Sequence, residues 1–542
     1  MIKLIYNDTA VGAQIAFVPS ATGGDAISKV EQLGLVGVTF PKYGTVAELN
    51  GFALDGSMAI LPDDTADTTI GLWSGAVSDA DGNLPVPIVI TLTAPDLYTS
   101  LGITITAREA FPRAVNIKWY RDDTLLSDKD FAPDSESYYC ENKVESYNKL
   151  IITITSLVLP YRRLMLQGIM HGRIREFDGR QLADASVIQQ CSPISAEVAI
   201  NTLDFTLIGD SDIDYVFQSK QSLEIYNNDE LLGVFFVRSY RRTAQRFYSV
   251  SSEDYIGLLN AVQFAGGVYT ERNAYELLTA IFAAANVPLE MDEALRGETV
   301  TGWIPVCTCR EAVRQICFAI GAAVDTTLSS RVRIFVSPNE IAHNFTASEI
   351  MQGQTLTDRD KKLTEVRLTV HGYAKGEKTE TAYSAEESGT GDGIYVEFNN
   401  PMYDLTITAG TIVESGANYA IINASDGCVL SGTLYNHTKT IRVMRNPLVN
   451  IGTPANVVAV ENMTLVSASN ADARLQALYD YYIVQGTINS ELVLARLRGT
   501  MAARPGDKVK IATVYAGVQT ARLESIRYKL YGGAIVADTE AH

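Results

Sequence analysis

The chain has 542 residues, of which 46% are hydrophobic and 20% charged, and its formal net charge is −19 at pH 7. A chain of this length is too long to fold around one hydrophobic core, so we expect about three to five domains. The composition is that of an ordinary globular protein, which excludes extensive disorder. The negative charge argues against nucleic acid or an anionic membrane as a surface ligand; solubility explains it, and a wall past which DNA slides without sticking is the alternative.

The sequence predicts neither a disulfide framework, nor a metal site, nor a cofactor site. Its cysteines are sparse for this length: Cys140, Cys191, Cys307, Cys309, Cys317 and Cys428. The cluster at 307–317 lacks both zinc-site spacing and a fourth ligand. The start of the chain lacks the apolar run of a signal peptide, and no stretch approaches the roughly 18 apolar residues of a membrane span. We therefore expect a protein that is made in a cytoplasm and stays reduced there.

Residues 1–165 are predicted to form a separate all-β unit, a sandwich of jelly-roll type. Its expected strands alternate apolar and polar residues: 88–93, 103–107, 115–120 and 150–155. Turn clusters separate them, and no long helix intervenes, which is typical of sandwiches.

Three aromatic residues of this unit are candidates for carbohydrate contact: Trp73, Trp119 and Tyr120. Sugars stack their CH faces on aromatic rings, which is why these residues are considered. Adjacent strand residues point to opposite faces, so only one of Trp119 and Tyr120 can point inward. The alternative, which we favour, is that one ring fills the core and the other covers an edge.

The segment that follows contains His171 and four arginines. Nothing at a recognisable spacing supplies His171 with a nucleophile or an orienting carboxylate, so it is interpreted as a boundary residue. The arginines are expected on a solvated face, with inter-subunit ion pairs as the alternative: Arg162, Arg163, Arg173 and Arg175.

Residues 166–265 are predicted to form a small antiparallel β-barrel. Apolar residues alternate with polar ones along 198–207, and Asn227, Asn228 and Asp229 form a break that suits a tight hairpin. Several such strands in succession favour a barrel.

Residues 266–350 are predicted to form a small α/β insert. Asn273 is the expected cap of a helix that buries 274, 277, 278, 281 and 282. Thr308 and Glu311 predict a capping box before a second helix, which buries Cys317 as a small core residue and ends at Gly321.

Residues 351–542 are predicted to form a second barrel with a loop and a helix inserted. The loop is expected over Lys375–Gly393 because this stretch is polar and glycine-rich. The helix begins near Asn470, and the turn Arg504-Pro-Gly-Asp precedes a closing strand.

The chain resembles a known family through these segments. The stretches Leu231-Leu-Gly-Val-Phe-Phe-Val, Asp254-Tyr-Ile-Gly-Leu-Leu and Arg504-Pro-Gly-Asp-Lys-Val, with the helices between them, resemble the baseplate hub and tail-tip proteins of bacteriophages and related contractile machines, Tal-like hubs included. The resemblance covers residues 170–540. The stretches from Ala114, Phe131 and Tyr147 look like galactose-binding-type sandwiches; this resemblance is one of pattern and carries over no sugar-binding residues.

The resemblance implies a virion structural protein. It implies a homotrimer located in the tail of a phage, prophage or tailocin, where two barrels per chain match a sixfold tube. The implied partners are distal tail and tape-measure proteins, with DNA only in transit. The implied function is to close or extend the tail tube and to mediate attachment or DNA passage.

Two alternative functions differ in class. An adhesin would bind host-surface glycans through the first sandwich. A cell-wall hydrolase is disfavoured, because the histidines are scattered and neither a His-Glu-x-x-His motif nor a Gly-x-Ser-x-Gly elbow occurs. Carboxylates are abundant enough to supply a glycosidase pair. We expect a protein that is not an enzyme.

Overall fold

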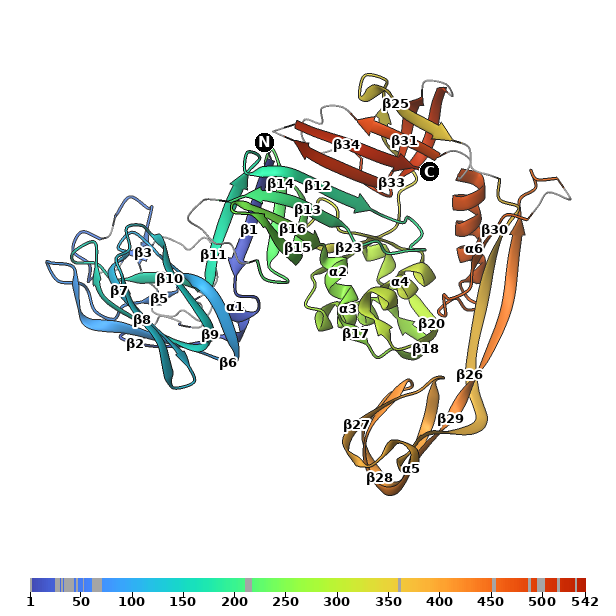
Figure 1. Cartoon of the computed structure of the whole chain (residues 1–542), viewed down its shortest axis with the longest axis horizontal. Helices are drawn as coiled ribbons and strands as arrows, with labels where there is room; N and C mark the ends of the chain where they lie inside the picture. Colours follow the sequence, from blue (N-terminus) through green and yellow to red (C-terminus); the bar gives the residue numbers. More distant parts are fainter. Residues whose placement is uncertain are drawn as a thin grey trace. The chain divides into compact units, whose positions relative to one another are not determined.

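The computed structural model describes residues 2–24, 30, 33, 43–44, 47–51, 53–60, 71–209, 217–358, 362–450, 455–485, 489–494, 503–513, 517–531 and 534–542. These residues form two compact units, each described by itself (Figure 1). The N-terminal unit is Ile5–Glu176 with Val216–Ser222, and the C-terminal unit is Met1–Leu4, Phe177–Tyr215 and Leu223–His542. Strands dominate both units, so the expected mainly-β class is confirmed.

The N-terminal unit is built on one seven-stranded sheet of the described residues. Its strand order is β5-β10-β6-β9-β7-β8, and β2 pairs with β6 as well. The bounds of its elements are β1 (Ile2–Thr9, shared with the other unit), α1 (Ala13–Ala16), β2 (Val18–Thr22), β3 (Tyr43–Gly44), β4 (Ala59–Ile60), β5 (Leu72–Trp73), β6 (Asn83–Ala107), β7 (Pro112–Arg121), β8 (Thr124–Phe131), β9 (Ser137–Leu157), β10 (Met165–Met170) and β11 (Gly172–Asp178).

The strands of this unit are longer than the sequence predicts. The expected strands 88–93 and 103–107 are both parts of β6, which pairs along its length with β9. The pairing shifts register at several points, and such irregularities bend and twist a ladder. The inward residues, among them Ile88, Trp119 and Tyr147, form one buried cluster. Bent strands therefore enclose a core within a single hydrogen-bonded sheet.

The C-terminal unit contains most strands of a second, 13-stranded sheet of the described residues. Its successive neighbours include β14-β15-β16-β13-β12-β33-β34-β31-β25, and β24 joins through β32. The bounds are β12 (Leu182–Gln190), β13 (Thr202–Ile208), β14 (Ser222–Asn227), β15 (Glu230–Ala244), β16 (Phe247–Glu253), β24 (Ile341–Phe345), β25 (Ile350–Asp358), β31 (Asn489–Leu494), β32 (Lys508–Thr513), β33 (Gly517–Tyr531) and β34 (Ala534–Ala541).

Two local predictions for this sheet are confirmed. Asn228 and Asp229, both at positive φ, turn the chain between β14 and β15. Such two-residue turns match the twist of the flanking strands. Before β32, Gly506 has a φ of 92°, which suits the predicted Pro-Gly turn.

The two predicted barrel blocks are joined in the structure. β12 of the first block pairs antiparallel with β33 of the second, with Val187 opposite Tyr528 and Ala185 opposite Leu530. All four side chains are buried. An unpaired β12 would expose a row of backbone donors and acceptors, and β33 covers that edge.

A helical module lies between the first and last strands of this sheet in sequence. Its elements are α2 (Tyr255–Asn260), β17 (Gln263–Phe264), β18 (Gly267–Asn273), α3 (Ala274–Ala284), β19 (Leu289–Met291), η2 (Glu293–Leu295), β20 (Thr299–Ile304), β21 (Cys307–Thr308), α4 (Cys309–Ile320), β22 (Ala323–Asp325) and β23 (Val332–Phe335). The predicted caps of α3 and α4 are confirmed: the side chains of Asn273 and Thr308 accept from the amides of Glu276 and Glu311. The Glu311 carboxylate, however, accepts from Arg314 and Gln315.

The predicted loop over Lys375–Gly393 is wrong. β26 (Glu365–Ser384) continues through most of it as a partner of β29 (Tyr419–Arg445), and α5 (Ala385–Ser388) and the start of β27 (Gly391–Glu397) follow. The prediction failed because this part of β26 lacks the alternation of apolar and polar residues by which a strand is recognised. Four consecutive residues are exposed there: Glu377, Lys378, Thr379 and Glu380. With β28 (Met402–Ser415) these strands form a small module around their own buried core (Figure 1).

The remaining elements are β30 (Val457–Val460), α6 (Ala471–Tyr479) and the π-helical η3 (Asp480–Gln485). α6 begins one residue after Asn470, where a helix was predicted, and buries Leu475 and Leu478. β30 runs parallel to β26. Residues of β26, β30, α6 and η3 pack together in a further apolar cluster of the C-terminal unit.

Candidate functional site

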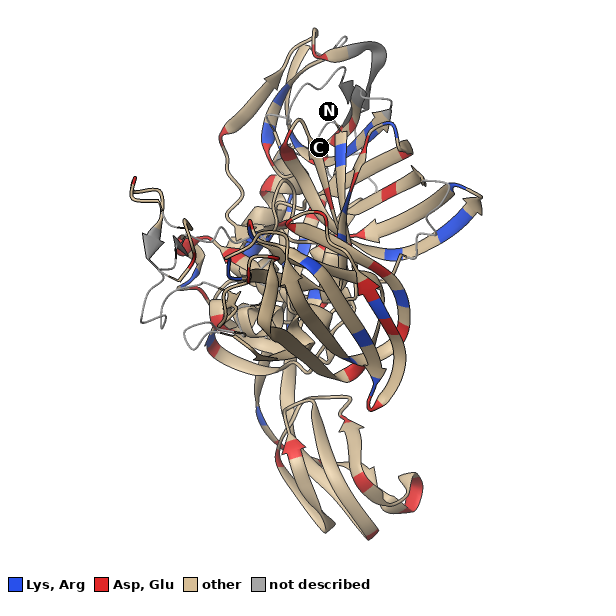
Figure 2. Ribbon diagram, turned by 90° about the vertical axis from the view of Figure 1, so that its left-hand side faces the viewer, with Lys and Arg blue, Asp and Glu red and all other residues tan. Residues whose placement is uncertain are grey.

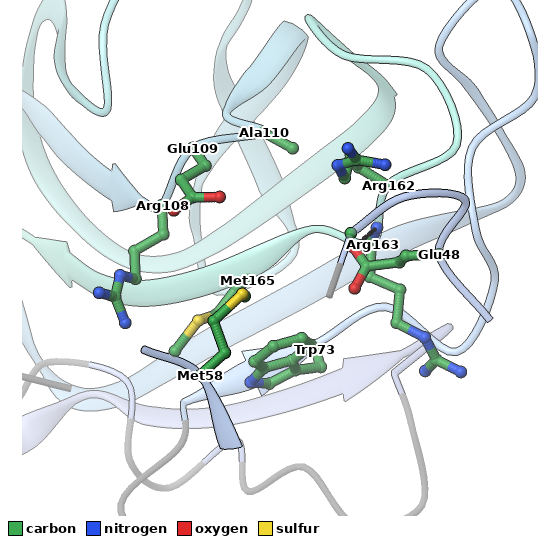
Figure 3. Close-up of a pocket in the computed structure, with 10 residues that line it drawn as sticks. Glu48, Met58, Trp73, Arg108, Glu109, Ala110, Arg162, Arg163 and Met165 are labelled. Carbon is green, nitrogen blue, oxygen red and sulfur yellow. Dashed lines mark hydrogen bonds between the residues drawn. The ribbon is translucent and has the colours of Figure 1, made fainter. Parts of the chain in front are cut away.

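A pocket in the N-terminal unit is the candidate that contains a predicted site residue. Trp73 of β5 lines a cavity of about 50 Å³. Other lining residues, several of them charged, are Glu48, Met58, Arg108, Glu109, Ala110, Arg162, Arg163 and Met165. In Figure 3, Met58 and Met165 lie together beside the Trp73 ring, and the charged side chains surround them.

Backbone and side-chain hydrogen bonds position the charged residues of this pocket. Glu48 accepts from the Arg163 amide at 2.8 Å, and the Arg163 guanidinium donates to the Ser74 carbonyl at 2.9 Å. Arg162 donates to the carbonyl of Leu49 at 2.6 Å. These two arginines are thus placed on the short segment around Glu48, and Arg163 does not extend from a solvated face.

The other two aromatic candidates do not join Trp73. Trp119 is fully buried in the core of the unit, with its ring edge-on to Phe131. Tyr120 is half-buried on the opposite side of β7, where the Lys149 ammonium lies 5.4 Å from its ring centroid. One ring therefore fills the core and the other covers an outer face, as the favoured alternative has it.

His171 lies in the N-terminal core. Its Nδ1 is 2.9 Å from the Tyr147 hydroxyl, and its ring stacks on Phe17 with a centroid distance of 4.2 Å. Burial lowers the pKa of His171 to about 3. A neutral, enclosed imidazole with these partners stabilises the core and has no access to a substrate.

Arg175 is buried as well, which corrects the expectation of a solvated face. Its Nε donates to Asp8 at 2.7 Å, and the two side chains are only 9% and 4% exposed. Tyr6 extends the network by donating to Gln221 at 2.6 Å. Burial raises the Tyr6 pKa well above its usual value. The arginine makes an ion pair within its own unit.

The C-terminal unit also buries ionisable groups at structural positions. Asp254 caps α2 by accepting from the amide of Ile256 at 3.0 Å, and it accepts from the Thr326 hydroxyl at 2.5 Å. Burial raises the pKa of Asp254 to about 7. A carboxyl with such a pKa suits acid–base chemistry, but full burial and a capping role indicate a structural one.

Two of the remaining histidines form a pair on the long hairpin of β26 and β29. His371 Nδ1 is 2.9 Å from His437 Nε2, and His371 Nε2 is 2.9 Å from the Glu461 carbonyl. Burial lowers the pKa of both. Tyr373 stacks on His437 with a centroid distance of 4.4 Å.

The cysteines are all free in the structure. Cys317 is fully buried in the core that α3 and α4 share, as predicted. Burial raises the pKa of Cys307 to about 12, which opposes thiolate formation. Within the described ranges, no three His, Cys, Asp or Glu side chains are grouped to hold a metal ion.

Sequence reasoning missed the joint between the module of β26–β29 and the helical module. Asn418, in the turn before β29, donates to the carbonyls of Ala265 at 2.7 Å and Ile304 at 2.8 Å. The Trp303 indole donates back to its Oδ1 at 2.7 Å. An asparagine in a turn gives no sequence signal for such a distant contact, because it is typical of turns anyway.

Comparisons with known proteins give likeness in structure only. No protein-family model matches the chain. No curated protein matches it. Among solved structures it is similar to the 43 kDa tail protein of prophage MuSo2 from Shewanella oneidensis, with a TM-score of 0.43 and 8% identity over 68% of this chain and 94% of that chain.

Two further tail proteins give similar values. The tail protein from Neisseria meningitidis has a TM-score of 0.41 and 12% identity over 67% of this chain and 92% of that chain. Prophage tail protein gp18 from Listeria monocytogenes has a TM-score of 0.39 and 12% identity over 68% of this chain and 91% of that chain. These neighbours come from the class of protein that the sequence resembles, phage tail proteins. At such scores and identities the likeness does not carry a function over to this chain.

In the part of the chain that the structure describes, no helix is long and apolar enough to cross a membrane.

Proposed function

We propose that this chain is a structural hub protein of a phage, prophage or tailocin tail. In this proposal it forms a homotrimer at the tail tip, closes or extends the tail tube, and mediates attachment or DNA passage. Its partners there are copies of itself and other tail proteins, the distal tail and tape-measure proteins among them.

One observation carries the proposal: the segments that resemble hub proteins fold into one unit. Residues 170–540 coincide closely with the C-terminal unit, and the pairing of β12 with β33 joins their two ends in a single sheet. The helical module lies between these ends in sequence, in the order that the resemblance implies. A coherent unit supports the view that the three short stretches belong to one architecture.

The positions of the perturbed ionisable groups favour a structural role over an enzymatic one. Asp254 and His171 have the strongly shifted pKa values of potential acid–base groups, but both are enclosed in packed cores. A catalytic group needs a cleft where a substrate can reach it.

The test is the mass and shape of the purified full-length chain. We expect sedimentation equilibrium to give three times the 59.0 kDa of one chain, and negative-stain images to show a hollow ring. A chain that is monomeric at all accessible concentrations, or one that releases reducing sugar from peptidoglycan, would overturn the proposal.

A second candidate function is an adhesin that binds host-surface glycan through the N-terminal unit. Its support is that Trp73 lines a pocket among charged, hydrogen-bonding side chains, as aromatic rings do in many ligand sites, although only 3% of its surface is exposed. We expect any glycan-array signal to be lost in Trp73→Ala and kept in Tyr120→Ala. No glycan bound by the intact chain would exclude this candidate.

A further inference from the structure

The end of β15 and the start of β16 form a hairpin, Arg238–Phe247, that departs from strand alternation. Every one of these ten residues is exposed, although β13 and β16 keep regular buried positions beside it. The pairing with β16 shifts register on either side of Arg238 and again near Thr243, which marks two bulges. We call this segment the arginine hairpin, because residues 238, 241, 242 and 246 are arginines and none of the ten is acidic.

The hairpin is held in shape by its own chain. Arg242 donates to the Gln245 carbonyl at 2.5 Å, and its guanidinium lies 5.3 Å from the centre of the Tyr248 ring. Arg246 donates to the Gly209 carbonyl at 2.9 Å, and Arg238 bonds Glu253 at 2.7 Å. A surface fixed in advance loses less conformational entropy when it binds a partner.

The composition of the hairpin is that of a protein-binding surface. Tyr240 and Phe247 are 42% and 38% exposed beside the arginines. Arginine and aromatic residues are enriched in the central parts of protein interfaces. Within the described ranges, Arg241 is exposed and has no ion-pair partner, so its charge is available.

A surface of opposite character lies on residues 375–435, which we call the arm module. This segment contains nine acidic residues and two lysines, a net charge of −7 in a chain of −19. Red segments mark these acids in the lowest part of Figure 2, which corresponds to β27, β28 and α5 in Figure 1.

Exposed apolar and acidic side chains lie together on the arm module. Tyr395 stacks on Tyr419 with a centroid distance of 5.5 Å and is still 52% exposed. Glu397 is exposed two residues along β27, and Glu414 accepts from the Tyr419 hydroxyl. Aromatic rings bordered by carboxylates complement a hairpin of aromatic rings bordered by guanidinium groups.

We propose that the arginine hairpin of one copy of this chain docks on the Tyr395–Glu397 surface of the arm module of a second copy. Both surfaces are exposed in the single chain, so the partner must come from outside it. The contact joins two different patches, and such contacts close into rings when the rotation between copies permits it. The proposal rests on the homotrimer of the proposed function and adds the subunit contact to it.

A second copy is a better partner for the hairpin than nucleic acid. A phosphate backbone would meet the four arginines but also the remaining surface of a chain with a net charge of −19. The arm module supplies carboxylates and exposed aromatic rings at once, whereas charge alone would recruit a polyanion.

The experiment compares the oligomer of three full-length variants by sedimentation velocity at 0.15 M salt, where exposed charges act over about 8 Å. Arg241→Glu removes the available positive charge, and Arg241→Glu with Glu397→Arg exchanges the two charges. Arg331→Glu is the matched control, since Arg331 is an exposed arginine of the same unit outside the hairpin. Circular dichroism checks that every variant folds.

We expect Arg241→Glu to raise the dissociation constant of the oligomer at least about tenfold. Arg331→Glu should leave it unchanged, and the charge exchange should restore most of the loss. If Arg241→Glu keeps the wild-type oligomer, the contact lies elsewhere while the trimer stands. If the wild-type chain is monomeric throughout, the proposed function fails as well. If Arg241→Glu instead abolishes retention of duplex DNA in a gel at unchanged mass, the hairpin binds nucleic acid and the proposal is overturned.

Discussion

The side-chain amide of Asn418 and the indole of Trp303 share a hydrogen bond of 2.7 Å that joins the arm module to β20 of the helical module. Asn418 also donates to two backbone carbonyls and is only 2% exposed. Its three bonds satisfy groups from both sides, so this residue fixes how the turn before β29 meets the helical module.

We expect Asn418→Ala to lower the free energy of unfolding by roughly 3 kcal/mol, because buried donors and acceptors would lose their partners. Urea unfolding followed by circular dichroism measures the loss. Asn423→Ala is the control: its Oδ1 accepts one exposed bond from the Gly393 amide at 2.9 Å, and we expect less than about 1 kcal/mol. Equal losses in the two variants would contradict this account of the joint.

The buried pair of Asp8 and Arg175 predicts a large effect of removing one charge. Asp8→Asn should lower the free energy of unfolding by about 3 kcal/mol, because the guanidinium would remain buried without its carboxylate. Asp128→Asn, in the exposed pair with Lys118, should cost much less, because solvent screens that pair. Chemical denaturation of both variants makes the comparison, and a cost at Asp8 as small as at Asp128 would show that the pair is not enclosed.

Asp254 predicts a pH dependence of stability. Its pKa of about 7 in the folded chain lies above the value of about 3.9 for an unfolded aspartate. The folded state therefore binds the extra proton between these values, and the stability from this group is present at acid pH and lost as the pH rises through 7.

Asp254→Asn should retain a capping oxygen without the charge and be more stable than the wild type at pH 8, with a smaller difference at pH 5. Thermal unfolding at the two pH values measures this. Asp254→Ala, which removes the cap, should be less stable at both. A wild type that is as stable as Asp254→Asn at pH 8 would contradict the raised pKa.

His171 predicts the opposite dependence. Its pKa of about 3 in the folded chain lies below the usual 6.5 or so, so only the unfolded state takes up a proton between these values. This contribution is present above pH 6.5 and lost as the pH falls toward 3. His171→Phe, which keeps the stack on Phe17, should lose less stability than the wild type between pH 7 and pH 5 in thermal unfolding. Identical losses would show that the imidazole reaches solvent.

Gly321 ends α4 at a φ of 77°, and a Cβ there would meet the guanidinium of Arg474. We expect Gly321→Ala to cost about 2 kcal/mol or more, from the left-handed backbone and the displaced arginine together. Gly427→Ala is the matched control, because its φ is 75° and its Cβ would have no neighbour within 4 Å. It should cost only the backbone part, about 1 kcal/mol. Urea unfolding separates the two, and equal costs would remove Arg474 from the explanation.

The sequence predicted the features that short-range chemistry determines. Thr308 and Gly321 bound α4 as expected, and the Asn228-Asp229 turn follows from side chains that tolerate positive φ. The partnership of β12 with β33 could not be predicted, because alternation shows that a strand has a buried face but not which strand lies beside it. Trp73 was identified as a candidate from its ring alone, while Glu48, which accepts from Arg163 in the same pocket, comes from a distant and featureless stretch.

The partnership of β12 with β33 has a consequence for biosynthesis. The ribosome releases β12 long before β33 exists, on the order of tens of seconds at ordinary elongation rates. During that interval β12 lacks its C-terminal neighbour, so a prematurely terminated chain cannot complete the sheet. Only molecules that include both strands can therefore present a finished C-terminal unit.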